Sequence, residues 1–193
     1  MDFFMPALSR RDFLLRAAAS LAALLVAPVA RAEGIQLAQA EITLKGELFQ
    51  LTGYFDIQLS STLENALQRG VQLTFVQAFE AQRERDFWLA EDLIELQRNV
   101  RLSYNALLRQ YYVSVQGVSS SHETLVDALR AVGDLRDWSI LNIKQTKKKS
   151  SNRAYIRMYL DIAQLPKPLQ VTALASSSRW QLDSGWQERS FKY

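Results

Sequence analysis

Long stretches of this chain alternate apolar and polar residues with a period of two. The clearest stretch runs from Phe49 to Leu59, and the same pattern returns from Ile94 to Tyr104 and from Ala154 to Ile162. In a strand, this period places the apolar side chains on one face and the polar side chains on the other. A sheet built from such strands buries one face and leaves the other in water, which is typical of antiparallel sheets. Only Arg98 breaks the apolar row of its segment.

Weaker patterns predict further strands and two short helices. We expect the strands over residues 38–44, 71–79, 107–115 and 138–143. We expect the helices over residues 60–69 and 121–132, each beginning near Ser or Thr and ending before a glycine. Because the strands follow one another without strict alternation with helices, the order predicts an antiparallel, strand-dominated α+β domain. Two arrangements remain open: a β-sandwich-like pair of facing sheets, and one curved sheet covered by the helices.

The connections and the C-terminal region are less regular. Residues 83–91 interrupt two long strands and are expected to form a hairpin tip, while residues 144–152 form a polar loop. Pro166 and Pro168 lack amide donors, so their segment is expected to cross an end of a sheet rather than lie within it. Trp180, Leu182 and Trp186 are expected to close the core.

The first 32 residues have the features of an export signal. A motif similar to the twin-arginine signal comes first, and its residues are Ser9, Arg10, Arg11, Phe13 and Leu14. An uncharged, alanine-rich segment follows, and it is shorter than the ~20 residues that span a bilayer. Ala30 and Ala32 match the small residues of a signal-peptidase site. We therefore expect cleavage after Ala32 and a single periplasmic domain over residues 33–193. A general secretory signal is the alternative to the twin-arginine route.

The composition excludes several kinds of chemistry. The chain has no cysteine and one histidine, which excludes disulfides, thiolate metal sites, cysteine nucleophiles and histidine-rich metal sites. No ligand set for a cofactor is recognised, so no cofactor is expected. The formal net charge is +3, but the export signal holds most of that excess, and the remaining chain is nearly neutral. This nearly neutral charge and the predicted periplasmic location argue against nucleic acid as a partner.

Three segments together carry a resemblance to a known family. They are RLSYNALLRQY at Arg101–Tyr111, LPKPLQV at Leu165–Val171 and WQLDSGW at Trp180–Trp186. In this order, behind an export signal, they resemble the uncharacterised proteobacterial family called domain of unknown function 4390. The resemblance implies an exported, single-domain protein with no assigned activity and no catalytic residues to carry over. It also implies a gene neighbourhood with a nitrogen-regulation-type sensor kinase, which suggests an accessory role beside a membrane sensor kinase.

No group of residues indicates a catalytic centre, so the leading hypothesis is a non-enzymatic binding or regulatory domain. His122 is the only imidazole, and we expect it to be exposed at the start of a helix. The alternative is an envelope hydrolase in which two carboxylates converge in a cleft. Its candidate residues are Glu80, Glu84, Glu91 and Asp92. A third hypothesis, an envelope lipid- or sugar-binding domain, needs an apolar pocket between the sheets.

Two exposed segments are the candidate partner contacts. The first is the predicted hairpin tip with Phe87, Trp88 and Leu89. Large apolar residues at such a tip often mark a contact with a protein or a membrane. The second is the basic loop with Lys147, Lys148 and Lys149, which suits anionic lipid or an acidic partner. We expect an inner-membrane protein as the partner, with peripheral membrane contact as a further option.

Overall fold

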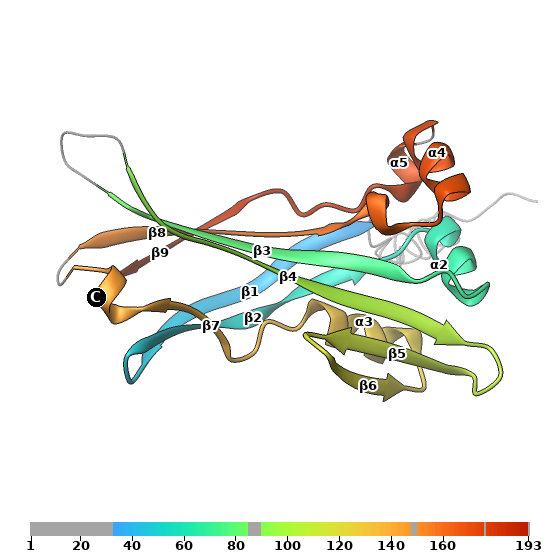
Figure 1. The fold of residues 1–193 in the computed structure, drawn as a ribbon, viewed down its shortest axis with the longest axis horizontal. Helices are drawn as coiled ribbons and strands as arrows, with labels where there is room; N and C mark the ends of the chain where they lie inside the picture. The colour runs from blue at the N-terminus through green and yellow to red at the C-terminus, as the bar shows by residue number, and fades with distance from the viewer. Residues whose placement is uncertain (1–32, 85–89, 148–149, 176, 193) are drawn as a thin grey trace, which may run out of the picture. The chain divides into compact units, whose positions relative to one another are not determined.

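The alternating segments form the strands of two antiparallel sheets (Figure 1). The computed structural model describes residues 33–84, 90–147, 150–175 and 177–192. The three-stranded sheet has the order β1-β2-β7, with β1 at Gly34–Lys45, β2 at Leu48–Gln58 and β7 at Trp138–Asn142. The six-stranded sheet has the order β6-β5-β4-β3-β8-β9. Its strands are β3 (Leu73–Arg83), β4 (Glu91–Asn105), β5 (Gln110–Val115), β6 (Val118–His122), β8 (Ser151–Leu160) and β9 (Gln187–Lys192). The predicted strand-dominated, antiparallel α+β class is confirmed.

One hydrophobic core joins the two sheets. Inward-facing side chains of both sheets, such as Phe55 on β2 and Phe75 on β3, are buried in the same cluster. Phe79 on β3 meets Trp138 on β7 edge to face, with their ring centroids 6.3 Å apart. The two sheets therefore face each other, as the β-sandwich-like alternative predicts.

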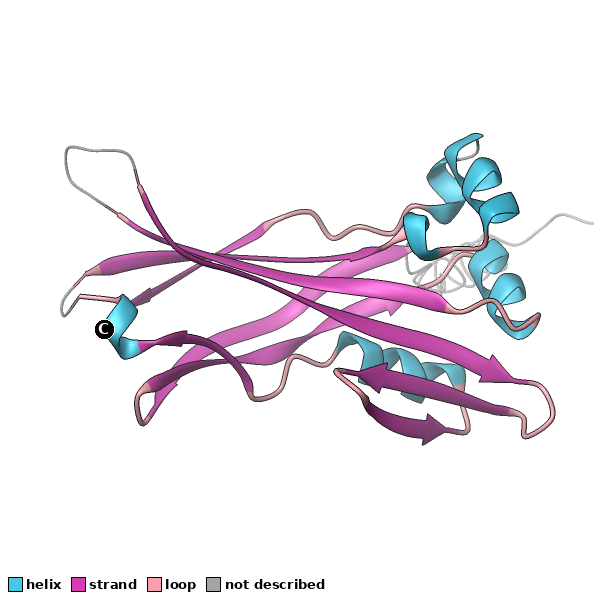
Figure 2. Ribbon diagram, in the orientation of Figure 1, coloured by secondary structure: helices cyan, strands magenta, loops and turns pink. Residues whose placement is uncertain are grey.

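The first predicted helix is present as α2 (Ser61–Gln68). The Ser60 hydroxyl caps it by accepting a hydrogen bond from the backbone N–H of Leu63 (3.3 Å). Leu63 and Leu67 are fully buried, and Gly70, with φ of 86°, follows the end of the helix. Figure 2 shows α2 at the same end of the sheets as the turn between β4 and β5.

The second predicted helix begins later than expected. Helix α3 covers Leu125–Gly133, and the Thr124 side chain caps it by accepting a backbone hydrogen bond of 3.1 Å. The residues before it form β6, because Gln116 and Gly117 have φ values of 49° and 87°. Two consecutive positive φ values make a tight hairpin turn that returns the chain beside β5. The prediction of a helix from Ser121 is therefore wrong at its N-terminal end.

The C-terminal region contains elements that the alternating pattern does not predict. They are the short 3-10 helices η1 (Ile143–Gln145) and η2 (Ile162–Gln164), the helices α4 (Lys167–Ala175) and α5 (Ser177–Trp180), and β9. Trp180 and Leu182 are buried, which confirms their predicted place in the core. Trp186 is 41% exposed, so its predicted burial is wrong. Its ring lies against the Arg157 guanidinium, 5.7 Å from centroid to carbon.

Arg98, the residue that interrupts the apolar row of β4, holds the C-terminal end of α3. Its Nη2 donates to the carbonyl of Asp134 (2.9 Å) and its Nε donates to the amide oxygen of Gln77 (2.6 Å). Gln77 is fully buried and donates in turn to the carbonyl of Val132 (2.9 Å). The guanidinium carbon also lies 4.4 Å from the ring centroid of Trp138. The positive charge thus meets the Asp134 carbonyl at the negative end of the helix dipole.

Candidate functional site

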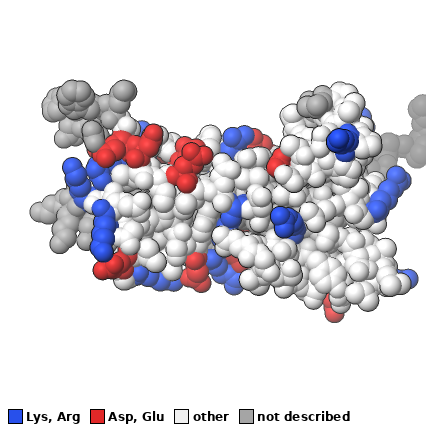
Figure 3. Space-filling view, in the orientation of Figure 1, with Lys and Arg blue, Asp and Glu red and all other residues white. Residues whose placement is uncertain are grey.

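The region of the six-stranded sheet made by the end of β4, β5 and β6 carries almost no charge. Arg109 is the only charged residue between Ser103 and His122. Figure 3 shows the same asymmetry, because acidic and basic side chains gather at one end of the sheets and are sparse over β5 and β6. Cores of protein interfaces are depleted of charged residues and enriched in aromatic ones. This surface is therefore the candidate interface of the protein.

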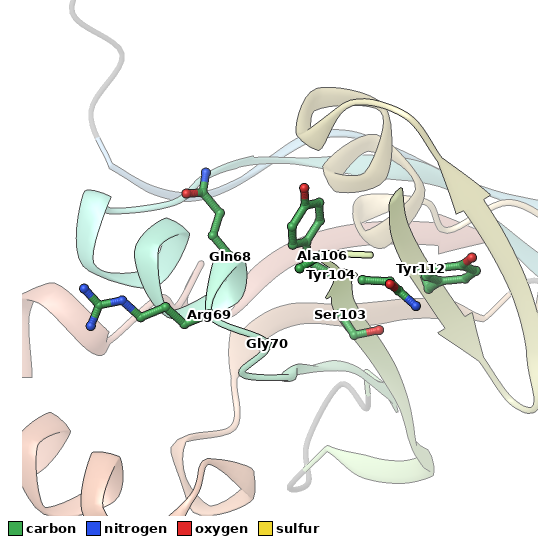
Figure 4. A pocket seen from close by; sticks show the side chains of 8 residues that line it. Gln68, Arg69, Gly70, Ser103, Tyr104, Ala106 and Tyr112 are labelled. Atoms are coloured by element: carbon green, nitrogen blue, oxygen red, sulfur yellow. The ribbon is translucent and has the colours of Figure 1, made fainter. Parts of the chain in front are cut away.

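A groove of about 620 Å³, which we call the Tyr104 groove, opens between α2 and this surface. Its lining residues are Gln68, Arg69, Gly70, Ser103, Tyr104, Asn105, Ala106 and Tyr112. Figure 4 shows the Tyr104 ring standing between α2 and Tyr112, with the Arg69 side chain directed away from both rings. The groove therefore offers aromatic faces together with neutral hydroxyl and amide groups.

Neighbouring side chains hold Tyr104 and Tyr112 of the groove, and the adjacent Tyr111, in place. The rings of Tyr104 and Tyr111 lie with centroids 4.7 Å apart and planes tilted by 43°. Burial raises the pKa of the Tyr111 phenol, and the nearby Tyr104 and Glu64 raise it further. Tyr111 is therefore uncharged at neutral pH. The Tyr112 hydroxyl donates to the side-chain oxygen of Gln110 at 3.3 Å.

Two leucines project from the turn beside the groove, and we call Leu107 and Leu108 the Leu107 tip. Leu107 is 91% exposed and Leu108 is 57% exposed. The Asn105 side-chain oxygen accepts hydrogen bonds from the backbone N–H groups of both leucines, each at 3.0 Å. Arg109 then closes the turn with φ of 53°. This Asx turn holds the two apolar side chains in water in a defined position.

The sequence pattern missed this tip. It predicted that Leu107 belongs to a strand with Tyr111 and Val113, which is wrong because the chain turns after Asn105. An asparagine whose side chain can accept from the backbone N–H groups two and three residues later is a turn signal. The alternation of apolar residues on both sides of the turn concealed that signal.

Most of the residues predicted as partner contacts lie outside the described residues. This holds for Phe87, Trp88 and Leu89 of the hairpin tip, and for Lys148 and Lys149 of the basic loop. The export motif and the predicted cleavage site also lie outside them. Lys147 is described and exposed, and its carbonyl accepts a hydrogen bond from the Ser150 hydroxyl (2.6 Å).

The four predicted carboxylates separate into two groups. Glu84 pairs with Arg153 (2.7 Å) and Glu91 pairs with Arg83 (2.9 Å). The other two, Glu80 and Asp92, line one shallow groove of about 320 Å³ on the outer face of the sheet. Glu95 also lines that groove, directly across the strands from Glu80.

The electrostatics of Glu80 lead to a test of this acidic groove. Burial raises the pKa of the Glu80 carboxyl, Glu95 and Asp92 raise it further, and Arg157 opposes them. A carboxyl with a raised pKa binds its proton more tightly in the folded state, so its contribution to stability falls as the pH rises through that pKa. We therefore expect Glu80→Gln to raise the thermal unfolding midpoint at neutral pH, with a smaller gain near pH ~4.

The contribution of Glu95 to the raised pKa of Glu80 can be measured separately. We expect Glu95→Gln to move the pKa of Glu80 down towards its ordinary value, as read from the Glu80 side-chain signal in an NMR titration. An unchanged Glu80 titration in this variant would show that Glu95 does not act on it.

His122 does not stand at a helix start as predicted, because it is the last residue of β6. Its Nε2 lies 2.9 Å from the hydroxyl of Ser120, two residues earlier on the same exposed strand. Asp127, which a Ser/His/Asp triad would need, instead accepts a hydrogen bond from the Thr124 hydroxyl (2.6 Å). The arrangement therefore lacks the relay that orients a catalytic histidine.

The described part of the chain has neither a metal-binding cluster nor a membrane-spanning helix. Within it, no three or more His, Asp or Glu side chains gather where they could hold a metal ion. Within the same residues, no helix has the length and apolar character needed to cross a bilayer.

Comparison with known proteins identifies a family. Neither the curated proteins nor the solved structures contain a match to this chain. A family model described as a domain of unknown function (DUF4390) matches residues 32–190, which is nearly all of the part that the structure describes. The chain therefore belongs to the DUF4390 family.

Proposed function

We propose that this protein is a periplasmic, non-enzymatic binding domain that docks onto an inner-membrane protein. The Leu107 tip is the observation that supports this proposal most strongly. Two large apolar side chains are held in water by a hydrogen-bonded turn, so their exposure is built into the fold. Burying them against a partner would gain about 1.5–3 kcal/mol for each fully covered side chain.

The groove beside the tip favours a protein over the apolar part of a bilayer as the partner. Ser103, Asn105 and Tyr112 offer hydroxyl and amide groups that can pair with the polar groups of a peptide. Hydrocarbon has no such groups, so burial there would leave part of the hydrogen-bonding capacity of these side chains unsatisfied. Tyr, Ser, Asn and Gly also dominate binding surfaces that adapt to protein partners.

A membrane sensor kinase is the partner that we propose, following the gene neighbourhood that the family resemblance implies. In this role the domain would act as an accessory that reports to the kinase from the periplasm. The tip would then contact the periplasmic part of the kinase, and the tyrosines of the groove would contribute specificity.

The double variant Leu107→Ser/Leu108→Ser tests the proposal. We expect it to keep the circular dichroism spectrum of the wild type, because both side chains lie in water. We expect its capture of the membrane partner from solubilised envelopes to fall about tenfold or more, since central apolar anchors dominate binding.

A matched control is available at the opposite end of the sheets. Leu44 and Leu48 flank the β1–β2 turn and are 41% and 40% exposed. Leu44→Ser/Leu48→Ser should leave capture unchanged. Equal capture by both double variants would contradict the proposed role of the Leu107 tip.

A second candidate function is carboxylate-dependent hydrolysis of an envelope polysaccharide. Glu80 shares one groove with Asp92, and burial raises the pKa of Glu80, which is the direction of shift that a general acid needs. Purified peptidoglycan is the probe, and the release of reducing ends is the readout. Release by the wild type that Glu80→Gln abolishes would support hydrolysis, and no release by the wild type would remove it.

A further inference from the structure

The two edges of the six-stranded sheet differ in chemistry. β9, at one edge, carries three charged residues, Glu188, Arg189 and Lys192. β6, at the other edge, has the sequence VSSSH and carries no Asp, Glu, Lys or Arg. Charged side chains, prolines and bulges are the devices that keep an edge strand from pairing with another chain. β9 has such charged residues. β6 has no proline and no Asp, Glu, Lys or Arg, and its pairing with β5 shows no bulge.

β6 is also accessible along its length. Among the described residues it pairs with β5 on one side only, from Val118 opposite Val115 to His122 opposite Tyr111. Val118 is 76% exposed, and the three serines that follow are exposed as well. Figures 1 and 2 show β6 as the outermost strand, with α3 packed behind the sheet rather than across its edge. Backbone N–H and C=O groups therefore face solvent along this edge.

We propose that β6 pairs antiparallel with β6 of a second copy of this chain, joining two six-stranded sheets into one continuous sheet. This goes beyond the proposed function, since it concerns the free edge of β6 rather than the Leu107 tip and the Tyr104 groove. Antiparallel pairing of a strand with itself has its two-fold axis at the middle residue, which is Ser120. Val118 then lies opposite His122 of the partner subunit, and Ser119 lies opposite Ser121 of the partner subunit.

The side chains of β6 suit this symmetric pairing. The serines that meet across the axis are small and uncharged, so no like charges and no bulky groups oppose each other. The pairing also covers apolar surface at both ends. Val118, which is 76% exposed, comes next to His122 of the partner subunit.

Sedimentation of protein produced from the complete chain tests this pairing. We expect the wild type to form a dimer, and a wild type that stays monomeric up to its solubility limit would overturn the proposal. Ser120→Lys places two ammonium groups opposite each other at the axis, so dimerisation should weaken about tenfold or more. Ser190→Lys, the same change on the exposed side of β9, is the control that should leave the dimer intact.

A charge-swap experiment separates the pairing from loss of folding. Ser120→Glu alone should weaken dimerisation in the same way, whereas an equimolar mixture of Ser120→Lys and Ser120→Glu should form a mixed dimer. A mixed dimer would show that both variants fold and that residue 120 meets its own copy. A dimer that persists in Ser120→Lys alone would overturn the proposed interface. Both variants keep Leu107 and Leu108, so they leave the partner contact of the proposed function intact.

Discussion

Gly133→Ala is expected to lower the free energy of unfolding by about 3 kcal/mol or more, because the new methyl group meets backbone that cannot move aside. A Cβ at Gly133 would lie 2.2 Å from the carbonyl oxygen of Phe55 on β2. The Phe55 carbonyl is held in place by β2 and the Gly133 backbone by α3, so α3 would have to shift away from the sheet. That shift would open the core around Ala128 and Val132, the fully buried side chains of α3 itself.

Gly46→Ala is the matched control for this prediction. Gly46 lies in the β1–β2 turn with φ of 64°, and a Cβ there would meet nothing within 4 Å. The substitution should therefore cost only the ~1 kcal/mol of a left-handed backbone conformation. Urea unfolding curves of both variants measure the difference, and equal losses of stability would contradict the close packing of α3 on β2.

Arg98→Ala is expected to lower the free energy of unfolding by about 2–3 kcal/mol. The change removes the donors to the Asp134 carbonyl and to the Gln77 amide oxygen, and it removes the cation from the face of Trp138. The Gln77 oxygen is fully buried and would lose this hydrogen bond. Burial lowers the pKa of Arg98 to about 10, so the guanidinium is charged at neutral pH. Arg98→Ala therefore also removes a partly buried positive charge.

Arg101→Ala provides the comparison, since Arg101 lies on the same strand with its side chain exposed on the other face. It should change the free energy of unfolding by no more than about 0.5 kcal/mol. Chemical denaturation measures both variants. A similarly small effect of Arg98→Ala would mean that the contacts of Arg98 do not stabilise the packing of α3 against β4.

The period-two pattern predicted most of the fold because the apolar residues of each alternating segment are the ones that face the core. Each long alternating segment is a strand whose apolar face lies in the core, as β8 shows from Asn152 to Leu160. The one interruption, Arg98, could be recognised from the sequence but not explained. Its partners come from β3, β7 and the end of α3, and no local pattern indicates which distant elements will meet.

The errors of prediction arose where local signals competed. The serines before His122 resemble helix caps, but the Gln116–Gly117 turn makes them a strand, and the true cap is Thr124. β9 was missed because only Phe191 among its residues is deeply buried. Trp186 was expected in the core, yet its ring lies over Arg157 at the surface. In each case a tertiary contact or a turn, rather than hydrophobicity, decided the outcome.

The candidate site was predicted less well than the fold. Binding residues on loops leave no periodic signal, and Leu107 even extended an alternating row across the turn. What could be predicted is the chemical class of the surface. The stretch from Ser103 to His122 holds tyrosines, serines and leucines with the single charge of Arg109, and the fold places that stretch along one end of the six-stranded sheet.

Photo-crosslinking in living cells tests most directly whether the Leu107 tip contacts an inner-membrane protein. A photoreactive amino acid would replace Leu107 in the full-length chain, and Leu44 in the control, before irradiation and mass spectrometry of the adducts. We predict one crosslinked membrane protein from position 107 and none from position 44. Position 107 yielding no adduct, or the same adducts as position 44, would contradict a role of the tip in partner binding.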